Sequence, residues 1–252
     1  MKPGYVDIGK FINITNITAT SWINITIHYG DEDVPEYTKE TTLRFYELNQ
    51  SQWEPMPSTV NEASNYVNAN ITSFSIYGIF GNFTTITFNL SEGWNMITIP
   101  LINDSFSTAE ELGTFIPNCT IVALWSAKEQ RYVSHIVGFG YDFDIVNGTG
   151  YFIYVTDDTQ VTLNGSGIKE INLSLKTGYD LIGWTHSLPT NASTLLSHIT
   201  NCVKVATWNA SQQMWMPEYM AFQQVPGFDP EIIAGEGMFV FIISGTTQWD
   251  GD

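Results

Sequence analysis

The sequence predicts a mainly β protein. We expect a β-sandwich-like domain at residues 1–85, followed by two tandem β-rich repeats at 86–170 and 171–252, each with one short helix. Three observations support this class: apolar and polar residues alternate along several segments, two stretches of about 85 residues align with each other, and 43% of residues are hydrophobic and 14% aromatic. That composition can fill folded cores and is untypical of a disordered stalk.

The first domain is predicted from period-two alternation. Ile23, Ile25 and Ile27 are apolar while Asn24 and Thr26 are polar. This pattern is typical of a strand with one face buried and the other in water. Residues 42–57 then suggest a strand, a turn and a Pro-rich loop, and residues 71–80 a closing strand. Short alternating strands separated by turns favour a small β-sandwich.

The two following domains are predicted from an internal repeat. The distance in sequence between aligned residues varies from 83 to 87, as insertions in loops would cause. Residues 86–97 align with 171–182 at an offset of 85, Asn118, Cys119, Trp125 and Tyr132 with Asn201, Cys202, Trp208 and Trp215 at 83, and 148–154 with 235–241 at 87.

Each repeat has the same predicted order of elements. A strand leaves a Gly-aromatic turn, a short helix follows near 107–110 or 191–199, and three further strands are expected near 121–125, 131–137 and 151–155 in the first copy. Ser107 and Glu110 have the spacing of a capping box. We expect positive φ at the glycine pairs 148/150 and 235/237. These glycines precede a strand rather than a helix, so they do not form a phosphate-binding loop.

The tripeptide Asn-x-Ser/Thr is strongly enriched. Since 46 of 252 residues are Ser or Thr, about three or four of the 19 Asn should begin such a triplet by chance. The chain has 14 of them: Asn13, Asn16, Asn24, Asn49, Asn70, Asn82, Asn89, Asn103, Asn118, Asn147, Asn164, Asn172, Asn191 and Asn209. The triplet is the acceptor for N-glycans on secreted surfaces, although strand and turn preferences also favour Thr and Asn. We therefore expect an extracellular glycoprotein with some of these sites occupied.

Charge excludes two classes of partner. The net charge is −17, yet only 14% of residues are charged, so the acidity comes from scarce Lys and Arg. Nine cations spread over the chain cannot form the basic stripe that nucleic acid requires, and they disfavour anionic lipid. No run approaches the eighteen apolar residues of a membrane-spanning helix. We expect neither nucleic-acid binding nor direct membrane insertion by this segment.

Cys119 and Cys202 occupy aligned positions of the two repeats. In an extracellular chain they could form a disulfide between the modules. The alternatives are buried free thiols or cross-links between molecules.

Few residues point to catalysis or metal binding. The four histidines form no zinc-like spacing, and no Gly-x-Ser-x-Gly elbow is present. Asp142 and Asp144 align with Asp229 and Glu231 ahead of the Gly turns, which makes them weak calcium candidates, although solvated loop acids explain them as well. No cofactor is expected. The repeated aromatics Trp125/Trp208 and Tyr132/Trp215 could stack on sugar rings, but we expect them to face a core across a hairpin.

Two stretches resemble known families. The block Tyr5–Phe80, with Ser21-Trp22-Ile, Leu43-Arg-Phe-Tyr followed by Trp53, and Ser73-Phe-Ser-Ile-Tyr-Gly, resembles the PGF-pre-PGF domain of archaeal, especially methanogen, cell-surface proteins. The modules with Gly93-Trp-Asn-Met-Ile and Gly148-Thr-Gly-Tyr-Phe resemble GWNLI…GxGYW surface repeats; the second copy departs from that pattern at Tyr179 and Met238. The resemblance implies an extracellular, anchored, non-enzymatic module.

The functional expectation combines these lines. We expect a non-enzymatic, N-glycosylated module of the archaeal cell surface, of S-layer, sheath or adhesin type. Its partners would be other envelope proteins, copies of itself or polysaccharide. The alternatives are a secreted carbohydrate-binding or glycan-active protein and an accessory module of a secreted protease. Exposed aromatics beside acids, at positions such as Trp53 and Trp94, would favour the carbohydrate-binding alternative.

Overall fold

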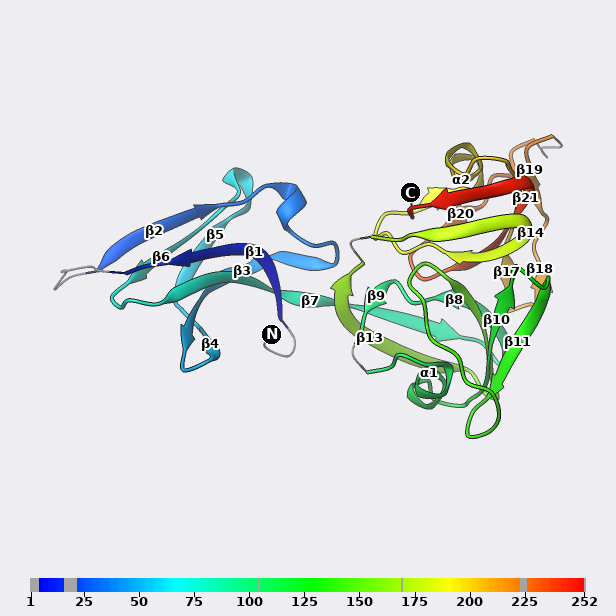
Figure 1. The fold of residues 1–252 in the computed structure, drawn as a ribbon, viewed down its shortest axis with the longest axis horizontal. Helices are drawn as coiled ribbons and strands as arrows, with labels where there is room; N and C mark the ends of the chain where they lie inside the picture. Colours follow the sequence, from blue (N-terminus) through cyan, green and yellow to red (C-terminus); the bar gives the residue numbers. More distant parts are fainter. Residues whose placement is uncertain (1–4, 16–21, 104, 169, 223–225, 252) are drawn as a thin grey trace. The chain divides into compact units, whose positions relative to one another are not determined.

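The computed structural model describes residues 5–15, 22–103, 105–168, 170–222 and 226–251. It is mainly β, with several sheets and two short α-helices, which confirms the predicted class (Figure 1). The chain forms two compact units, one of residues 1–85 with 164–166 and one of residues 86–163 with 167–252. Apart from residues 164–166, the stretch 86–252, in which the sequence predicts two domains, lies in one unit.

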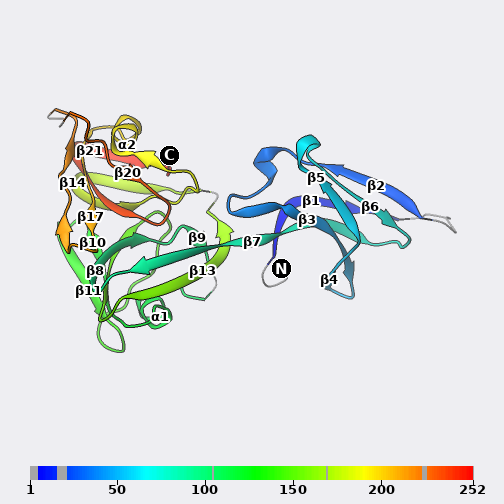
Figure 2. The same cartoon turned by 180° about the vertical axis from the view of Figure 1, so that it is seen from behind.

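The first unit contains two sheets, which can be followed in Figure 2. In one, β3 and β7 are neighbours, β4 pairs with β3 and β1 with β7; the other has the order β2-β6-β5. Two 3-10 turns lie at Asp31–Asp33 and Glu62–Ser64. The strands are β1 (Tyr5–Asn13), β2 (Ile23–His28), β3 (Thr38–Asn49), β4 (Gln52–Pro55), β5 (Ser58–Asn61), β6 (Tyr66–Ile71) and β7 (Ile76–Leu90), whose last residues belong to the second unit.

The alternation noted in the sequence determines which residues enter the core of this unit. Ile25 and Ile27 of β2 pack against a cluster that includes Phe45 of β3 and Ile79 of β7. Residues of both sheets therefore share one core. Asn24 lies directly opposite Asn70 of β6 and is exposed, as the period of two requires.

The second unit has two halves, residues 86–163 and 167–252. The short helices expected from sequence are present in both. The elements of the first half are β8 (Gly93–Thr98), β9 (Leu101–Ile102), α1 (Ala109–Phe115), β10 (Cys119–Ser126), β11 (Arg131–Ile136), β12 (Gly150–Val155) and the first residues of β13 (Thr159–Gly167), a strand whose residues 164–166 belong to the first unit. Those of the second half are β14 (Leu173–Gly183), β15 (Thr190–Asn191), α2 (Ala192–His198), β16 (Cys202–Ala206), β17 (Trp208–Asn209), β18 (Met214–Trp215), β19 (Tyr219–Met220), β20 (Glu231–Ile232) and β21 (Gly237–Trp249).

The main sheets of the two halves have corresponding strand orders. One reads β8-β12-β10-β11 and the other β14-β21-β16-β19. Aligned residues also share unusual backbone conformations. Positive φ occurs at Gly93 (98°) and Gly178 (108°), Asn118 (60°) and Asn201 (62°), Gln130 (50°) and Gln213 (51°), and Gly148 (76°) and Gly235 (87°).

The expectation for the glycine pairs is correct for only one member of each. Gly148 and Gly235 have positive φ, whereas Gly150 and Gly237 do not. A Cβ on Gly150 would lie 2.6 Å from the carbonyl oxygen of Ile182, and one on Gly237 would lie 3.0 Å from that of Ile97. These second glycines are needed because the backbones of the two halves approach closely there.

The predicted capping box is displaced by one residue. Thr108, not Ser107, is the N-cap of α1, and its side chain accepts a hydrogen bond from the Glu111 N–H at 3.3 Å. The Glu111 carboxylate in turn accepts from the Ser107 N–H at 2.7 Å. The helix therefore begins one residue later than the sequence pattern indicates.

The predicted disulfide is not formed: Cys119 and Cys202 are both free. Each thiol lies in its own half, where the Cys119 Sγ donates to the Ile121 carbonyl at 3.6 Å and the Cys202 Sγ to the Lys204 carbonyl at 3.4 Å. Burial raises the pKa of each thiol to about 11. The aligned cysteines are thus equivalent packing residues, since each contributes to its own half and neither reaches the other.

A buried polar residue at corresponding places in β8 and β14 differs between the halves. Asn95 accepts a hydrogen bond from the Ser91 N–H at 2.9 Å and donates to the Ser91 carbonyl at 2.8 Å. The aligned Asp180 accepts from the Lys176 N–H at 2.9 Å. Burial raises the pKa of Asp180 to about 6, although the Lys176 N–H and its charge oppose the rise. The Asn95 amide makes its hydrogen bonds at this buried position without a charge, whereas the Asp180 carboxylate would carry one.

We expect both thiols to react slowly in the folded protein. At pH 8 a pKa of about 11 leaves almost no thiolate, which is the reactive form. Iodoacetamide should label two cysteines in urea and far less than one per chain in buffer. Mass spectrometry of the non-reduced protein checks this, and a cross-linked Cys119–Cys202 peptide would contradict it.

Asp180→Asn should stabilise the protein at pH 8 and have little effect near pH 4. The folded-state pKa of Asp180, about 6, lies above the ordinary value of 3.8 for an Asp side chain, so the stability that the protonated carboxyl contributes is lost as pH rises through about 6. The difference between the two pKa values corresponds to at most about 3 kcal/mol. Urea unfolding at both pH values measures the difference.

Asn95→Asp is the matched control for this substitution. It places a carboxyl group at the aligned buried site, so it should create the pH dependence that Asp180→Asn removes. Equal effects of Asp180→Asn at pH 4 and pH 8 would show that buried charge is not the cause.

Candidate functional site

A hydrophobic cluster joins the two halves of the second unit. It is built from three pairs of aligned residues, so each half contributes the same three positions. The pairs are Met96 with Leu181, Ala123 with Ala206, and Phe152 with Phe239. The halves are also joined by backbone hydrogen bonds, from the Thr98 N–H to the Gly235 carbonyl and from the Gly183 N–H to the Gly148 carbonyl, both at 2.8 Å.

Two tryptophans make reciprocal hydrogen bonds across this cluster. Trp125 of the first half donates its indole N–H to the carbonyl of Tyr179 at 2.7 Å. Trp208 of the second half donates to the carbonyl of Trp94 at 2.8 Å. Because Trp94 aligns with Tyr179 and Trp125 with Trp208, the same interaction occurs twice in opposite directions.

Two glutamines hold the same backbone segments. The Gln213 side-chain oxygen accepts from the Trp94 N–H at 2.7 Å, and its amide nitrogen donates to the Trp94 carbonyl at 2.9 Å. Gln130 does the same at Tyr179, at 2.9 and 3.0 Å. Neither glutamine was expected from the sequence. They stand two places before Tyr132 and Trp215, so extending the repeat alignment would have found them.

Two cavities of similar size flank the cluster. The Trp125 pocket has a volume of about 330 Å³ and is lined by Trp125, Tyr132, Tyr179, Ala206, Trp215, Glu218 and Phe239. The Trp208 pocket has about 340 Å³ and is lined by Trp94, Ala123, Tyr132, Ser134, Phe152, Trp208 and Trp215. In the repeat alignment, nearly every residue that lines one pocket is matched with a residue that lines the other. Tyr132 and Trp215 line both, so the pockets share a wall.

The rings that line these pockets are held by neighbouring rings. Trp125 and Tyr132 face each other across β10 and β11 with centroids 4.9 Å apart, and Trp208 and Trp215 do so at 5.2 Å across β17 and β18. The hairpin pairing expected from sequence is confirmed. The expected burial is wrong in part, because Tyr132 remains 42% and Trp215 43% exposed. Trp53, by contrast, packs against Phe80 in the first unit.

One ion pair borders the Trp125 pocket. The carboxylate of Glu218 accepts a hydrogen bond from the Lys204 ammonium at 2.9 Å, and this bond is the main cause of the raised pKa of Lys204. The Lys204 ammonium also lies 5.8 Å from the centroid of the Phe241 ring. In the Trp208 pocket the corresponding edge carries the hydroxyl of Ser134. The pockets therefore combine apolar walls with a few polar groups, as small-molecule sites do.

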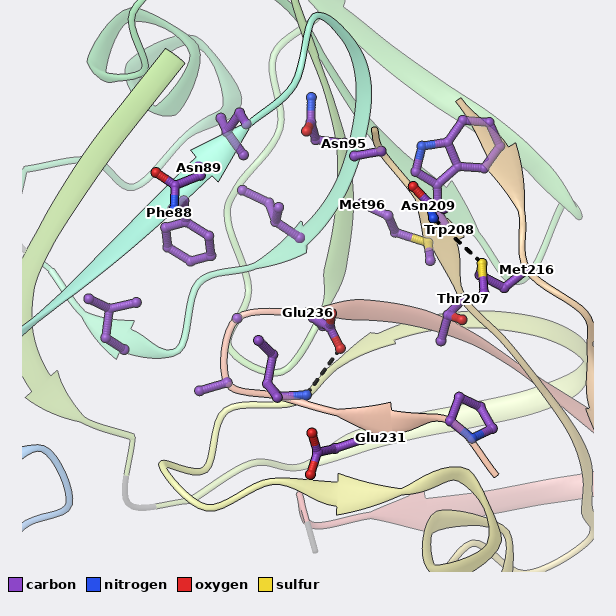
Figure 3. Close-up of a pocket in the computed structure, with 18 of the residues that line it drawn as sticks. Phe88, Asn89, Asn95, Met96, Thr207, Trp208, Asn209, Met216, Glu231 and Glu236 are labelled. Carbon is purple, nitrogen blue, oxygen red and sulfur yellow. Dashed lines mark hydrogen bonds between the residues drawn. The ribbon is translucent and has the colours of Figure 1, made fainter. Parts of the chain in front are cut away.

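A larger cavity of about 530 Å³ in the second unit is also lined by Trp208 and by Met96 of the cluster (Figure 3). Among its described lining residues, Glu231 and Glu236 are the titratable ones. Burial raises the pKa of Glu236, and its carboxylate accepts a hydrogen bond from the Ile233 N–H at 3.0 Å within its own turn. The Glu236 carboxylate thus stabilises the backbone of its own turn.

Two of the four calcium candidates accept hydrogen bonds from backbone N–H groups at the starts of the two helices. The Asp142 carboxylate accepts from the Glu110 N–H in the first turn of α1 at 3.0 Å, and Asp229 accepts from the Ser193 N–H of α2 at the same distance. Asp144 pairs with Thr108 and Glu231 pairs with Asn191, the residues that precede α1 and α2. Within the described ranges, no three His, Cys, Asp or Glu side chains gather as metal ligands. The acids recur in both copies because both helix starts need a partner.

The acceptor asparagines lie mainly at the surface. Asn16 falls outside the described residues. Of the other thirteen, ten are exposed and three, Asn82, Asn103 and Asn209, are half-buried. Of the five Asn outside such triplets, Asn201 is exposed, Asn95 is buried, and Asn61, Asn65 and Asn68 are intermediate.

In comparisons with known proteins, no family model, no curated protein and no solved structure matches this chain. The helices in the described part of the chain are too short to span a membrane.

Gln213→Ala should destabilise the second unit by about 1–2 kcal/mol. The substitution leaves the N–H and carbonyl of Trp94 without these partners at a half-buried place. Gln130→Ala should cost a similar amount because its bonds to Tyr179 are the same. Chemical unfolding measures both. Gln52→Ala, at an exposed position of β4, is the control, and equal stability of all three variants would contradict the proposed role of the glutamines.

Proposed function

We propose that this chain is a non-enzymatic, N-glycosylated module of an archaeal cell-surface protein, of the S-layer, sheath or adhesin type. The observation that carries the proposal is the distribution of the acceptor asparagines. Ten of thirteen described acceptors are exposed, against one of five other asparagines. An Asn must be exposed to carry a glycan, so this distribution is the one that occupied acceptors require.

The arrangement of the units supports a structural or interaction role. In the proposed fold, the first unit is a β-sandwich, and residues 86–170 and 171–252 are two copies of one module packed face to face. The reciprocal bonds of Trp125 and Trp208 and the paired cluster residues support this relation. The resemblance to PGF-pre-PGF domains and GWNLI…GxGYW repeats supports the extracellular setting. Partners would then be envelope proteins, other copies of the chain or polysaccharide.

One acceptor pair limits the possible glycan load. The Asn24 amide nitrogen donates to the Asn70 side-chain oxygen at 2.8 Å, across β2 and β6. A glycan on the amide nitrogen of one would crowd the other. We therefore place at most one glycan on this pair.

Peptide mass spectrometry of the protein from its native host tests the proposal. We expect glycan mass on several of the ten exposed acceptors and lower occupancy at Asn82, Asn103 and Asn209, because half-buried amides are less accessible. Enzyme-free chemical deglycosylation should remove the added mass. An unmodified chain from the native host would overturn the proposal and reopen the enzyme alternatives.

A further inference from the structure

The two aromatic pockets of the second unit have the features of a ligand site. Their volumes, about 330 and 340 Å³, lie near the lower end of the range for small-molecule sites, roughly 300–1,000 Å³. Folded domains and helices are too large for such spaces. Flat aromatic rings form most of the walls, and the shared rings of Tyr132 and Trp215 are partly open to solvent.

The rings that form the walls pack against one another in the structure without a ligand. The Phe239 ring lies 5.2 Å from that of Trp125 and 5.7 Å from that of Trp215, while Phe152 lies 5.8 Å from Trp208 and 5.9 Å from Trp215. Most of these contacts are edge-to-face, the favoured geometry of aromatic pairs. A ligand that stacks on these rings would lose little affinity to ordering of the site.

The charges at the pockets favour a neutral ligand. Glu218 is the charged residue among those that line the two pockets, and Lys204 already neutralises it at 2.9 Å. A cation would have to compete with Lys204, although aromatic rings alone can attract one. An anion would meet Glu218 and a chain with a net charge of −17.

The polar groups favour a saccharide over a proline-rich peptide. Proline-rich peptides offer carbonyls and few N–H groups, so they need donors on the protein. The indole N–H groups of Trp125 and Trp208 are already donated to backbone carbonyls. The Tyr132 hydroxyl and the Trp215 indole N–H, however, line both pockets and can donate. A proline-rich peptide could accept from these two groups, but it would bring no donor to Glu218. The Glu218 carboxylate instead offers an acceptor, and the Ser134 hydroxyl both donates and accepts. Sugar hydroxyls can donate to these groups while the apolar face of the ring covers an aromatic wall.

We infer that the Trp125 and Trp208 pockets together bind a neutral saccharide chain, with one sugar ring in each pocket and Tyr132 and Trp215 between them. The duplication of the site matches a ligand built of repeated units. Because one chain would fill both pockets, an oligosaccharide should bind more tightly than its monomer. This inference goes beyond the proposed function and does not depend on whether the asparagines carry glycans.

The test uses the full chain, produced without glycans, with cellohexaose and chitohexaose as probes and isothermal titration calorimetry as the measurement. At least one hexasaccharide should bind with a dissociation constant below about 1 mM. Trp215→Ala and Tyr132→Ala should each weaken binding roughly tenfold or more, as truncation of a central aromatic contact does. Circular dichroism should show that both variants remain folded, since both side chains are more than 40% exposed.

Trp22→Ala is the matched control. Trp22 is 62% exposed and belongs to the first unit, so its removal should leave binding unchanged. The inference is overturned if neither hexasaccharide binds, if binding persists in the Tyr132→Ala/Trp215→Ala double variant, or if decaproline binds and the saccharides do not. None of these outcomes bears on glycan occupancy, so failure here is distinct from failure of the proposed function.

Discussion

The indole N–H groups of Trp125 and Trp208 each donate to a backbone carbonyl of the opposite half, and the structure of the second unit depends on this exchange. Each bond directs a large ring across the boundary, where it covers the paired residues of the cluster. The glutamines at 130 and 213 then hold the same backbone segments in place. A half on its own would leave its apolar face and these polar groups in water, so the two halves form one compact unit.

This packing also explains why small residues occur where they do. Gly150 and Gly237 allow the backbones of the halves to meet, and Gly183 lies against the side chain of Thr98. Positions away from the boundary follow a different rule. Cys119 and Cys202 point into their separate halves, and Asp142 and Asp229 accept from the N–H groups of their separate helices. Aligned residues of the two halves are therefore alike for two reasons. Some make the same contacts inside their own half, and others make the same contacts across the boundary.

The same boundary creates the aromatic pockets. The aromatic residues at this junction are not all buried, and two pockets lie between them. Tyr132 and Trp215 line both pockets and stay partly exposed. A structural role in joining the halves and a binding role for the rings are compatible, since the rings that stabilise the junction are also those that a ligand would contact.

The sequence by itself determined the β class and the surface position of Asn24. Both depend on local periodicity, which one segment displays without reference to any other. Comparison of two segments also paired the residues that share positive φ, such as Asn118 with Asn201. Only the tertiary structure decided that the cysteines are free, that the paired acids serve helix starts, and that the aromatics line pockets. Each of those outcomes depends on where a side chain meets a residue far away in sequence, and residue type and spacing do not specify that distance. Burial of Asp180 and exposure of Trp215 belong to the same group, because packing between the sheets sets both.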